Sequence, residues 1–215
     1  MLHDQATLLL CMRHGETDWN ASQRVQGHTD IALNARGRAQ ARALERALHG
    51  QELHAVYSSD LSRARQTAEP LARQRNLPLH CDRRLRERAF GAFEGSSFTQ
   101  LETLHPEHCA RWRCRDPQWA APAGGESLLE LRQRIADVVR EIAARHPGQV
   151  VAMVSHGGAL DCLYRLATGQ QLQAPRTWEL RNAAINRLLA SEGGLSLVGW
   201  NDCAHLEHSA DEAGA

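Results

Sequence analysis

Two histidines occupy equivalent places in this sequence, each one residue beyond a run of apolar residues and directly before glycine. His14 follows the apolar run at 7–12 and has Arg13 beside it, and His156 follows the apolar run at 150–154. Imidazole can act as a nucleophile, a general base or a hydrogen-bond donor near neutral pH. Glycine lets a ligand approach the backbone closely, and arginine binds anions such as phosphate. These residues indicate an anion site with two imidazoles, without showing which imidazole reacts.

The elements that position these histidines follow from the apolar patterns. The runs at 7–12 and 150–154 are short and almost entirely apolar, which is typical of strands covered on both faces. Ligands of open α/β sheets bind at the carboxyl ends of strands, so both histidines would lie at one edge of the sheet. A helix that begins after His156 would direct its free N–H groups and its dipole at the anion.

Strands and helices alternate along the rest of the chain. We predict further strands at 55–58 and 78–81 and a hairpin with strands at 183–190 and 195–200. We predict helices at 34–48, at 60–73 with Asp60 as its N-cap, from the capping box Ser127–Glu130 to Pro147, and from Gly157-Gly158 to about Thr168. This order favours an α/β fold with three layers, α/β/α, around an open, mostly parallel sheet.

The chain is expected to form a single domain over residues 1–215. The stretch 88–123 is irregular, with short helices predicted around 97–104 and 106–114, and we interpret it as a small helical cap insertion. The stretch 208–215 is small and polar, and we predict a disordered tail there.

The composition excludes several classes of function. The formal net charge is zero, so no overall field attracts nucleic acid or an anionic membrane. All 25 basic side chains are arginine and none is lysine, which excludes a Schiff-base nucleophile and a GxxxxGK[ST] phosphate loop. A serine hydrolase is also excluded, because Met153 stands where a GxSxG motif needs its first glycine.

The cysteines and the apolar runs bear on metal sites and on location. The six cysteines are scattered, with no CxxC pair and no zinc-like spacing, so we expect no metal site. No signal-peptide pattern occurs, and no apolar run approaches the length of about 18 residues that is needed to span a bilayer. We therefore expect a cytoplasmic protein with neither a membrane nor a nucleic acid as partner.

A series of motifs resembles, in order, the histidine phosphatase superfamily of phosphoglycerate mutase-like proteins. One Arg-His-Gly triplet is common, but an ordered set that spans residues 7 to 206 is specific. The matching segments are Arg13-His14-Gly15-Glu16-Thr17-x-Trp19-Asn20, Gln26-Gly27-His28-Thr29-Asp30, Leu33-Asn34-x-x-Gly37, Tyr57-Ser58-Ser59-Asp60-Leu61-Ser62-Arg63-Ala64-x-Gln66-Thr67-Ala68, Leu85-Arg86-Glu87-x-x-Phe90-Gly91-x-x-Glu94-Gly95, Gly124-Gly125-Glu126-Ser127, Val154-Ser155-His156-Gly157-Gly158 and, weakly, Asn201-x-x-x-His205-Leu206.

The resemblance implies roles that spacing alone leaves open. It makes His14 the nucleophile that attacks phosphorus, with the attacking nitrogen unprotonated. It makes Arg13 and Arg63 the clamp on the phosphoryl oxygens. It makes His156, expected to be cationic beside the phosphate, the group that stabilises charge in the transition state.

Three further roles come from the same resemblance. Glu87 matches the proton donor, which would protonate the leaving oxygen and then activate water. Taken without the resemblance, Glu87 is most simply a surface glutamate among arginines. The side chain of Asn20 and the amide of Gly157 would be further donors to phosphate.

Possible substrate contacts lie in a loop and in the cap. Arg24, Gln26 and Gly27 follow the nucleophile, and Arg113 and Arg115 belong to an arginine-rich run in the cap. If functional, the cap arginines predict a substrate with a second anionic group; a solvated helix face is the equally good alternative. Glu126 and Ser127 are expected to serve only the start of a helix.

The expected function is hydrolysis of a small phosphorylated metabolite through a phosphohistidine. Relatives that act as cofactor-dependent mutases carry a longer insertion after the acid glutamate, whereas Glu87 and Glu126 are close in this sequence. The alternatives are a 2,3-bisphosphoglycerate-dependent phosphoglycerate mutase and a non-catalytic protein that binds phosphorylated ligands. No cofactor is expected unless a mutase needs the bisphosphate as primer. The partner is a small phosphomonoester, and the chain is expected to be a monomer or homodimer.

Overall fold

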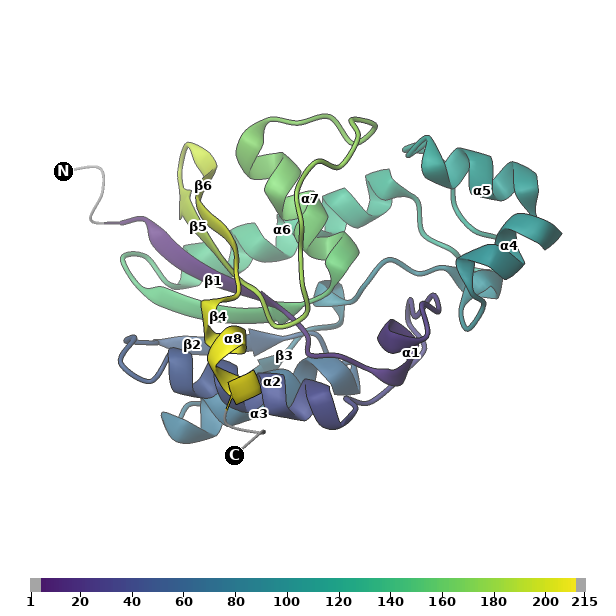
Figure 1. The fold of residues 1–215 in the computed structure, drawn as a ribbon. Helices are drawn as coiled ribbons and strands as arrows, with labels where there is room; N and C mark the ends of the chain where they lie inside the picture. The colour runs from purple at the N-terminus through teal and green to yellow at the C-terminus, as the bar shows by residue number, and fades with distance from the viewer. Residues whose placement is uncertain (1–4, 212–215) are drawn as a thin grey trace.

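Six strands form one mixed sheet in the order β3-β2-β4-β1-β5-β6 (Figure 1). The computed structural model describes residues 5–211, with side chains described up to residue 207. Strands β3, β2, β4 and β1 are parallel neighbours, whereas β5 is antiparallel to β1 and β6 is antiparallel to β5. The predicted mostly parallel sheet is confirmed. The strands are β1 (Thr7–Arg13), β2 (Ala55–Ser58), β3 (Leu79–Cys81), β4 (Val150–Ser155), β5 (Ile185–Ser191) and β6 (Gly194–Asp202).

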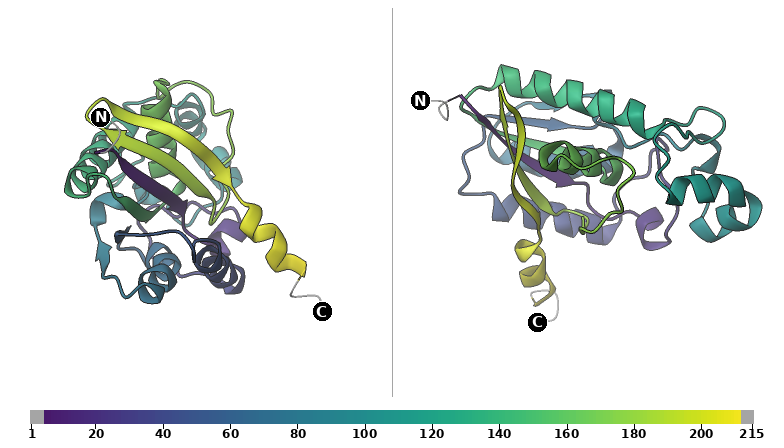
Figure 2. Two further views of the ribbon diagram at one scale, coloured as in Figure 1. Left: turned by 90° about the vertical axis from the view of Figure 1, so that its left-hand side faces the viewer. Right: turned by 90° about the horizontal axis from the view of Figure 1, so that it is seen from above.

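Helices cover both faces of this sheet and confirm the three-layer prediction (Figures 1 and 2). Alternate residues of one strand face opposite layers: Leu9 of β1 packs in the cluster of α6 and α7, and Leu10 packs in the cluster of α2 and α3. The covering helices are α2 (Ala35–Ala47) and α3 (Ser62–Gln74) on one face and α6 (Leu128–Arg145) and α7 (Gly157–Thr168) on the other. No helix within residues 5–211 is long and apolar enough to cross a membrane.

The stretch that we predicted as a cap, 88–123, projects beyond one end of the sheet (Figure 2). It contains a 3₁₀ turn (Gly91–Phe93) and two short helices, α4 (Phe98–Leu104) and α5 (Pro106–Arg113). These elements pack around their own small apolar cluster, which is separate from the two clusters of the sheet and consists of Phe93, Leu101, Cys109, Trp119 and Ala121.

Two local features differ from the sequence prediction. Helix α3 begins at Ser62 rather than after Asp60, because the Asp60 carboxylate pairs with Arg86 at 2.6 Å. The Asp30 carboxylate instead accepts hydrogen bonds from the Ser62 amide (2.7 Å) and hydroxyl (2.8 Å). At the C-terminus, α8 (Ala204–Asp211) occupies the first part of the stretch predicted to be disordered, because it follows directly on β6 and packs beside α2. Residues 212–215 of that stretch lie outside the described residues.

Candidate active site

A cavity of about 170 Å³ lies at the carboxyl end of β1 and reaches the cap. The cavity gathers side chains from the loop after β1, from α3, from the segment after β3 and from the cap. It brings together eight residues that the sequence had singled out, and three that it had not. The first group is Arg13, His14, Asn20, Arg24, Gln26, Gly27, Arg63 and Glu87, and the second is Val25, Phe90 and Trp112.

His14 is buried and its ring orientation is fixed. Its Nδ1 lies 2.7 Å from the Gly15 carbonyl, and since a carbonyl only accepts, Nδ1 carries the proton and Nε2 keeps its lone pair. Burial lowers the pKa of His14 well below 6.5, and the charges of Arg63 and Arg13 lower it further. The ring is therefore held in the neutral form that a nucleophile requires.

His156 lies against His14, with the two ring centroids 5.1 Å apart. Its Nδ1 accepts a hydrogen bond from Nε of Arg63 at 3.2 Å, so the proton is on Nε2, which is buried and has no partner. Burial, and then the charge of Arg63, lower the pKa of His156 well below 6.5. In the ligand-free site the His156 ring is thus a neutral donor, and the expectation that it is cationic beside a bound phosphate stays a prediction.

Arg63 is fully buried in α3 and stays charged at neutral pH. Burial lowers its pKa to about 10. Nη1 and Nη2 donate to the carbonyls of Thr29 (2.8 Å) and Gly27 (2.7 Å). Each of these nitrogens carries two hydrogens, so one N–H on each remains for a ligand.

Arg13 supplies a second guanidinium at the end of β1. Its Nη1 donates to the Leu180 carbonyl at 2.8 Å, whereas its Nε is buried without a partner. Burial lowers the pKa of Arg13, and the nearby Glu87 opposes this. A buried donor without a partner costs about 1–3 kcal/mol, and a phosphoryl oxygen would remove that cost for both Arg13 and His156.

The two further phosphate donors predicted by resemblance are at the start of helices. Asn20 lies in α1 (Asp18–Ala21), and its amide oxygen accepts from the Thr17 amide (3.1 Å) and from Asn182 (3.3 Å), which leaves its NH₂ group for the cavity. Gly157 is the first residue of α7. A Cβ built on it would lie 3.7 Å from Arg13 Nε, so its backbone passes directly beside the guanidinium.

Glu87 reaches the same place from the segment after β3 rather than lying free on the surface. Each of its carboxylate oxygens is 3.0 Å from the Gly158 amide, and one accepts from the Arg88 amide at 2.8 Å. A Cβ on Gly158 would come within 2.3 Å of the carboxylate, so only glycine permits this approach. The carboxylate thus sits at the start of α7, next to the phosphate donors.

The other end of the cavity is formed by the cap and the loop at 24–26. Phe90 and Trp112 stack with ring centroids 4.7 Å apart. Arg24 is exposed and donates to the Gly95 carbonyl at 2.7 Å, and Oε1 of Gln26 is buried without a partner. Neither aromatic residue was predicted as a contact. Two arginines that follow Trp112 were predicted as substrate contacts instead. Successive residues of a helix point about 100° apart, so Trp112 can face the cavity while the arginine next to it does not.

Arg113 and Arg115, predicted as substrate contacts, do not line the cavity. Arg113 forms an ion pair with Glu102 and lies over the ring of Phe98 at 5.2 Å. Arg115 donates to Asp161 at 2.6 Å and to the Leu172 carbonyl at 2.7 Å. Both side chains are occupied by structural contacts, which corrects the prediction. In the described part of the chain, no three His, Cys, Asp or Glu side chains gather into a group that could hold a metal ion.

Comparison with known proteins identifies the family. Residues 9–203 match the family model described as the histidine phosphatase superfamily (branch 1). Phosphoglycerate mutase-like protein 4 of Arabidopsis thaliana is 35% identical over 94% of this chain and 87% of that protein. The metal-independent phosphoserine phosphatase of Arabidopsis thaliana is 34% identical over 95% of this chain and 85% of that protein.

A solved structure of similar fold is that of the mycobacterial glucosyl-3-phosphoglycerate phosphatase. It has a TM-score of 0.81 and 31% sequence identity, and the match covers 93% of this chain and all of that one. The family model and the relatives both confirm the family predicted from the ordered motifs. The chain belongs to the histidine phosphatase superfamily.

Proposed function

We propose that this protein hydrolyses a small phosphorylated metabolite through a phosphohistidine on His14. One observation carries the proposal. The neutral His14 ring stands beside two buried donors that have no protein partner, Arg13 Nε and His156 Nε2. A phosphoryl group placed between them would meet a lone pair on one side and unpaired N–H groups on the others. Two of the similar proteins are named as phosphatases, for phosphoserine and for glucosyl-3-phosphoglycerate.

The first chemical step transfers the phosphoryl group to the enzyme. Nε2 of His14 attacks phosphorus, the bond from phosphorus to the ester oxygen breaks, and a proton from the Glu87 carboxyl group passes to that oxygen. The alcohol leaves, and His14 carries the phosphoryl group. Arg13, Arg63 and His156 would bind the equatorial oxygens, on which negative charge is spread in the transition state.

The second step returns the enzyme to its starting state. The Glu87 carboxylate takes a proton from water as the water oxygen attacks phosphorus, and the phosphorus–nitrogen bond to His14 breaks. Orthophosphate leaves, His14 is neutral again and Glu87 is again protonated. Proton transfer by such a group contributes about 100- to 10,000-fold to rate.

The far end of the cavity favours hydrolysis over a mutase reaction. Mutases of this family use cap arginines to hold a substrate carboxylate, and here Arg113 and Arg115 are paired with Glu102 and Asp161. Arg24 is the cation of that end, and the rest is aromatic or amide surface. We therefore expect a substrate whose leaving group packs on Phe90 and Trp112 and carries a hydroxyl or amino group for Gln26.

The remaining expectations belong to the same proposal. Catalysis needs no metal and no organic cofactor, so activity should survive EDTA. The substrate is a free small molecule, the compartment is the cytoplasm, and the protein is a monomer or a homodimer.

A substrate panel with mass detection tests the proposal. It compares orthophosphate release from many phosphomonoesters with the interconversion of 3-phosphoglycerate and 2-phosphoglycerate, with and without 2,3-bisphosphoglycerate. We expect hydrolysis of at least one metabolite to exceed the mutase reaction. Bisphosphate-dependent mutase activity far above hydrolysis would establish the mutase alternative. Tight phosphate binding with no turnover of any compound would establish the non-catalytic one.

A further inference from the structure

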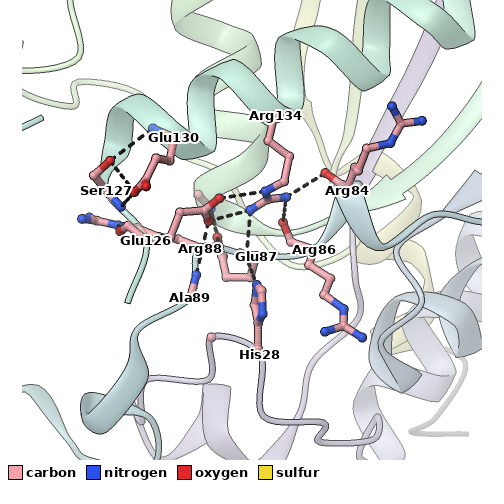
Figure 3. Close-up of polar contacts among 12 residues, drawn as sticks. His28, Arg84, Arg86, Glu87, Arg88, Ala89, Glu126, Ser127, Glu130 and Arg134 are labelled. Atoms are coloured by element: carbon pink, nitrogen blue, oxygen red, sulfur yellow. Dashed lines mark hydrogen bonds and ion pairs between the residues drawn. The ribbon is translucent and has the colours of Figure 1, made fainter. Parts of the chain in front are cut away.

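The backbone of the segment that carries Glu87 accepts hydrogen bonds from Arg134, a side chain of α6 (Figure 3). Nη1 of Arg134 donates to the carbonyls of Arg84 (2.7 Å) and Arg86 (3.0 Å), and Nη2 donates to the carbonyl of Glu87 (3.3 Å). One guanidinium thus binds three backbone carbonyls within four consecutive residues. The last of these residues is the one that would transfer the proton.

Arg134 is itself fixed by a carboxylate. Its Nε and Nη2 donate to the two oxygens of Glu126, at 2.8 Å and 2.6 Å (Figure 3). A guanidinium has five N–H groups, and these two bonds with the three to carbonyls use all of them. The two parallel hydrogen bonds to the Glu126 carboxylate restrict the guanidinium to a single orientation.

Glu126 connects this arrangement to the cap. Its amide donates to the Ala89 carbonyl at 2.9 Å, and its carbonyl accepts from Arg88 Nε at 2.6 Å. These two hydrogen bonds join residue 126, just after the cap, to residues 88 and 89 at the start of the cap, which directly follow Glu87. The sequence had assigned Glu126 to the helix start, but Ser127 and Glu130 form that capping box, and the Glu126 side chain serves Arg134.

Other contacts complete the support of the segment. The Ser155 hydroxyl donates to the Leu85 carbonyl at 2.8 Å, and Nε2 of His28 donates to the Glu87 carbonyl at 2.8 Å. Every carbonyl from residue 84 to residue 87 therefore accepts a hydrogen bond from a side chain, and Arg134 supplies most of these bonds. A single 3₁₀ turn (Arg83–Leu85) begins this segment and residues 86 and 87 lie outside it, so side-chain hydrogen bonds contribute much of what fixes the backbone.

Neither member of the pair can touch the substrate. Arg134 and Glu126 border a different cavity, of about 330 Å³, and neither lines the cavity of His14. Their side chains are 19% and 15% exposed, which excludes most solvent from the ion pair. Any effect on the reaction must therefore pass through the segment at 84–87 or through the start of the cap, to which Glu126 is bonded.

We propose that Arg134, oriented by Glu126, is the positioning residue for Glu87. The pair thereby links the position of the Glu87 carboxyl group to the position of the cap. The inference rests on the proposed function, in which Glu87 transfers the proton. A proton donor must come within about 2.6–3.2 Å of the leaving oxygen, and a misplacement of about 1 Å costs about 100-fold in rate. The pair sets this distance because it fixes the backbone from which Glu87 extends.

The dependence of rate on the leaving group separates positioning from general support. An alkyl alkoxide is a poor leaving group and needs the proton, whereas p-nitrophenolate leaves without one. Hydrolysis of the phosphohistidine is common to both esters, whereas kcat/KM reports the transfer to His14 alone. Loss of a positioned acid therefore lowers kcat/KM for an alkyl phosphomonoester much more than kcat/KM for p-nitrophenyl phosphate. The ratio of the two values does not depend on how much of a preparation is folded.

The experiment measures this ratio for Arg134→Gln, Arg134→Lys and Glu126→Gln with the best alkyl substrate of the panel and with p-nitrophenyl phosphate. We expect kcat/KM for the alkyl ester to fall about 10- to 100-fold in Arg134→Gln and kcat/KM for p-nitrophenyl phosphate to change less than about 3-fold. Arg134→Lys and Glu126→Gln should change the ratio in the same direction, because each removes the paired fork. Arg140→Gln is the matched control, since Arg140 lies on the exposed side of α6 and pairs with Asp137.

Combination with Glu87→Gln makes the test stricter. Once the acid is gone its position is irrelevant, so Glu87→Gln with Arg134→Gln should be no slower on the alkyl ester than Glu87→Gln alone. An equal fall of both substrates in the Arg134 variants would mean a structural role only and would overturn the proposal. If the wild-type protein hydrolyses neither ester, the proposed function fails; if it hydrolyses both and the ratio does not move, only the positioning role fails.

Discussion

The two ends of the active-site cavity are built in different ways. At the phosphate end, His14, His156 and Arg63 are buried, come from elements of the main sheet domain, and each has at least one nitrogen fixed by a protein acceptor or donor. At the far end, Arg24 is exposed, and Phe90 and Trp112 belong to a cap with its own small core. Under the proposed function, the buried end would bind the phosphoryl group that all substrates share, and the more exposed end would meet the part that varies between substrates.

The first prediction concerns the nucleophile at the phosphate end. His14→Ala should lower kcat for every substrate more than about 1,000-fold, because the attacking nitrogen is lost. Mass spectrometry of acid-quenched wild-type protein during turnover should also find a phosphoryl group on the peptide that contains His14. Thermal unfolding of the variant provides the control for folding. A largely active variant would refute the phosphohistidine mechanism.

The second prediction compares arginines from the two ends. Arg63→Lys should lower kcat/KM about 100-fold for all substrates alike, since lysine cannot bind the carbonyls of Gly27 and Thr29 and phosphate with one rigid fork. Arg24→Lys, the same change at the far end, should cost less than about 5-fold and differ between substrates. Similar, substrate-independent losses in both variants would contradict the division of the cavity.

The sequence predicted that the two histidines lie together, as they do, and the reason is physical. Two apolar strands that are each followed by histidine and glycine leave few places for those side chains, because the carboxyl ends of parallel strands share one edge. The protonation state of His156 was not predictable. It depends on burial and on the hydrogen bond from Arg63, which comes from α3, far away in the sequence.

The far end was predicted poorly, and the acid was predicted only through the resemblance. Arg113 and Arg115 seemed available for substrate, but Glu102 and Asp161 bind them through tertiary contacts that no local pattern announces. The support of Glu87 was missed in the same way, because its partners Arg134 and Gly158 lie 47 and 71 residues away. A sequence motif identifies the residues of the site, whereas the hydrogen-bond and ion-pair partners of those residues depend on the fold.

The third prediction uses the buried histidines to test the phosphate end. The pKa values of His14 and His156 are lowered in the folded state, so below about pH 6.5 the unfolded chain binds protons that the folded chain does not. Stability should therefore decrease as the pH falls, by about 1.4 kcal/mol in total for each of these histidines between about pH 7.5 and about pH 5.5. Urea unfolding from about pH 7.5 to about pH 5.5 measures this slope.

Two variants assign the slope to the right groups. His14→Ala should show a shallower loss of stability than wild type over this range, because one buried histidine is gone. His49→Ala removes an exposed histidine and should leave the slope unchanged. If both variants keep the wild-type slope, His14 is not held neutral by the fold.

The fourth prediction concerns the aromatic wall. Trp112→Ala removes the ring that stacks on Phe90 and should raise KM about 3- to 10-fold for substrates whose leaving group reaches the cap, with kcat little changed. Orthophosphate, which occupies only the phosphate end, should inhibit the variant and the wild type equally. A changed inhibition constant for orthophosphate would mean that the cap also shapes the phosphate end.

The smallest effect is expected from Arg113. This residue stands next to Trp112 in α5, but its guanidinium pairs with Glu102 and covers Phe98, away from the cavity. Arg113→Ala should therefore leave kcat/KM within about 2-fold of wild type for substrates with and without a second anionic group, because an exposed ion pair contributes little. Adjacent residues of one short helix would thus differ in function solely by the direction in which they point. A selective rise in KM for doubly anionic substrates would show instead that the cap moves to bring Arg113 over the cavity, and the far end would then have to be treated as a second anion site.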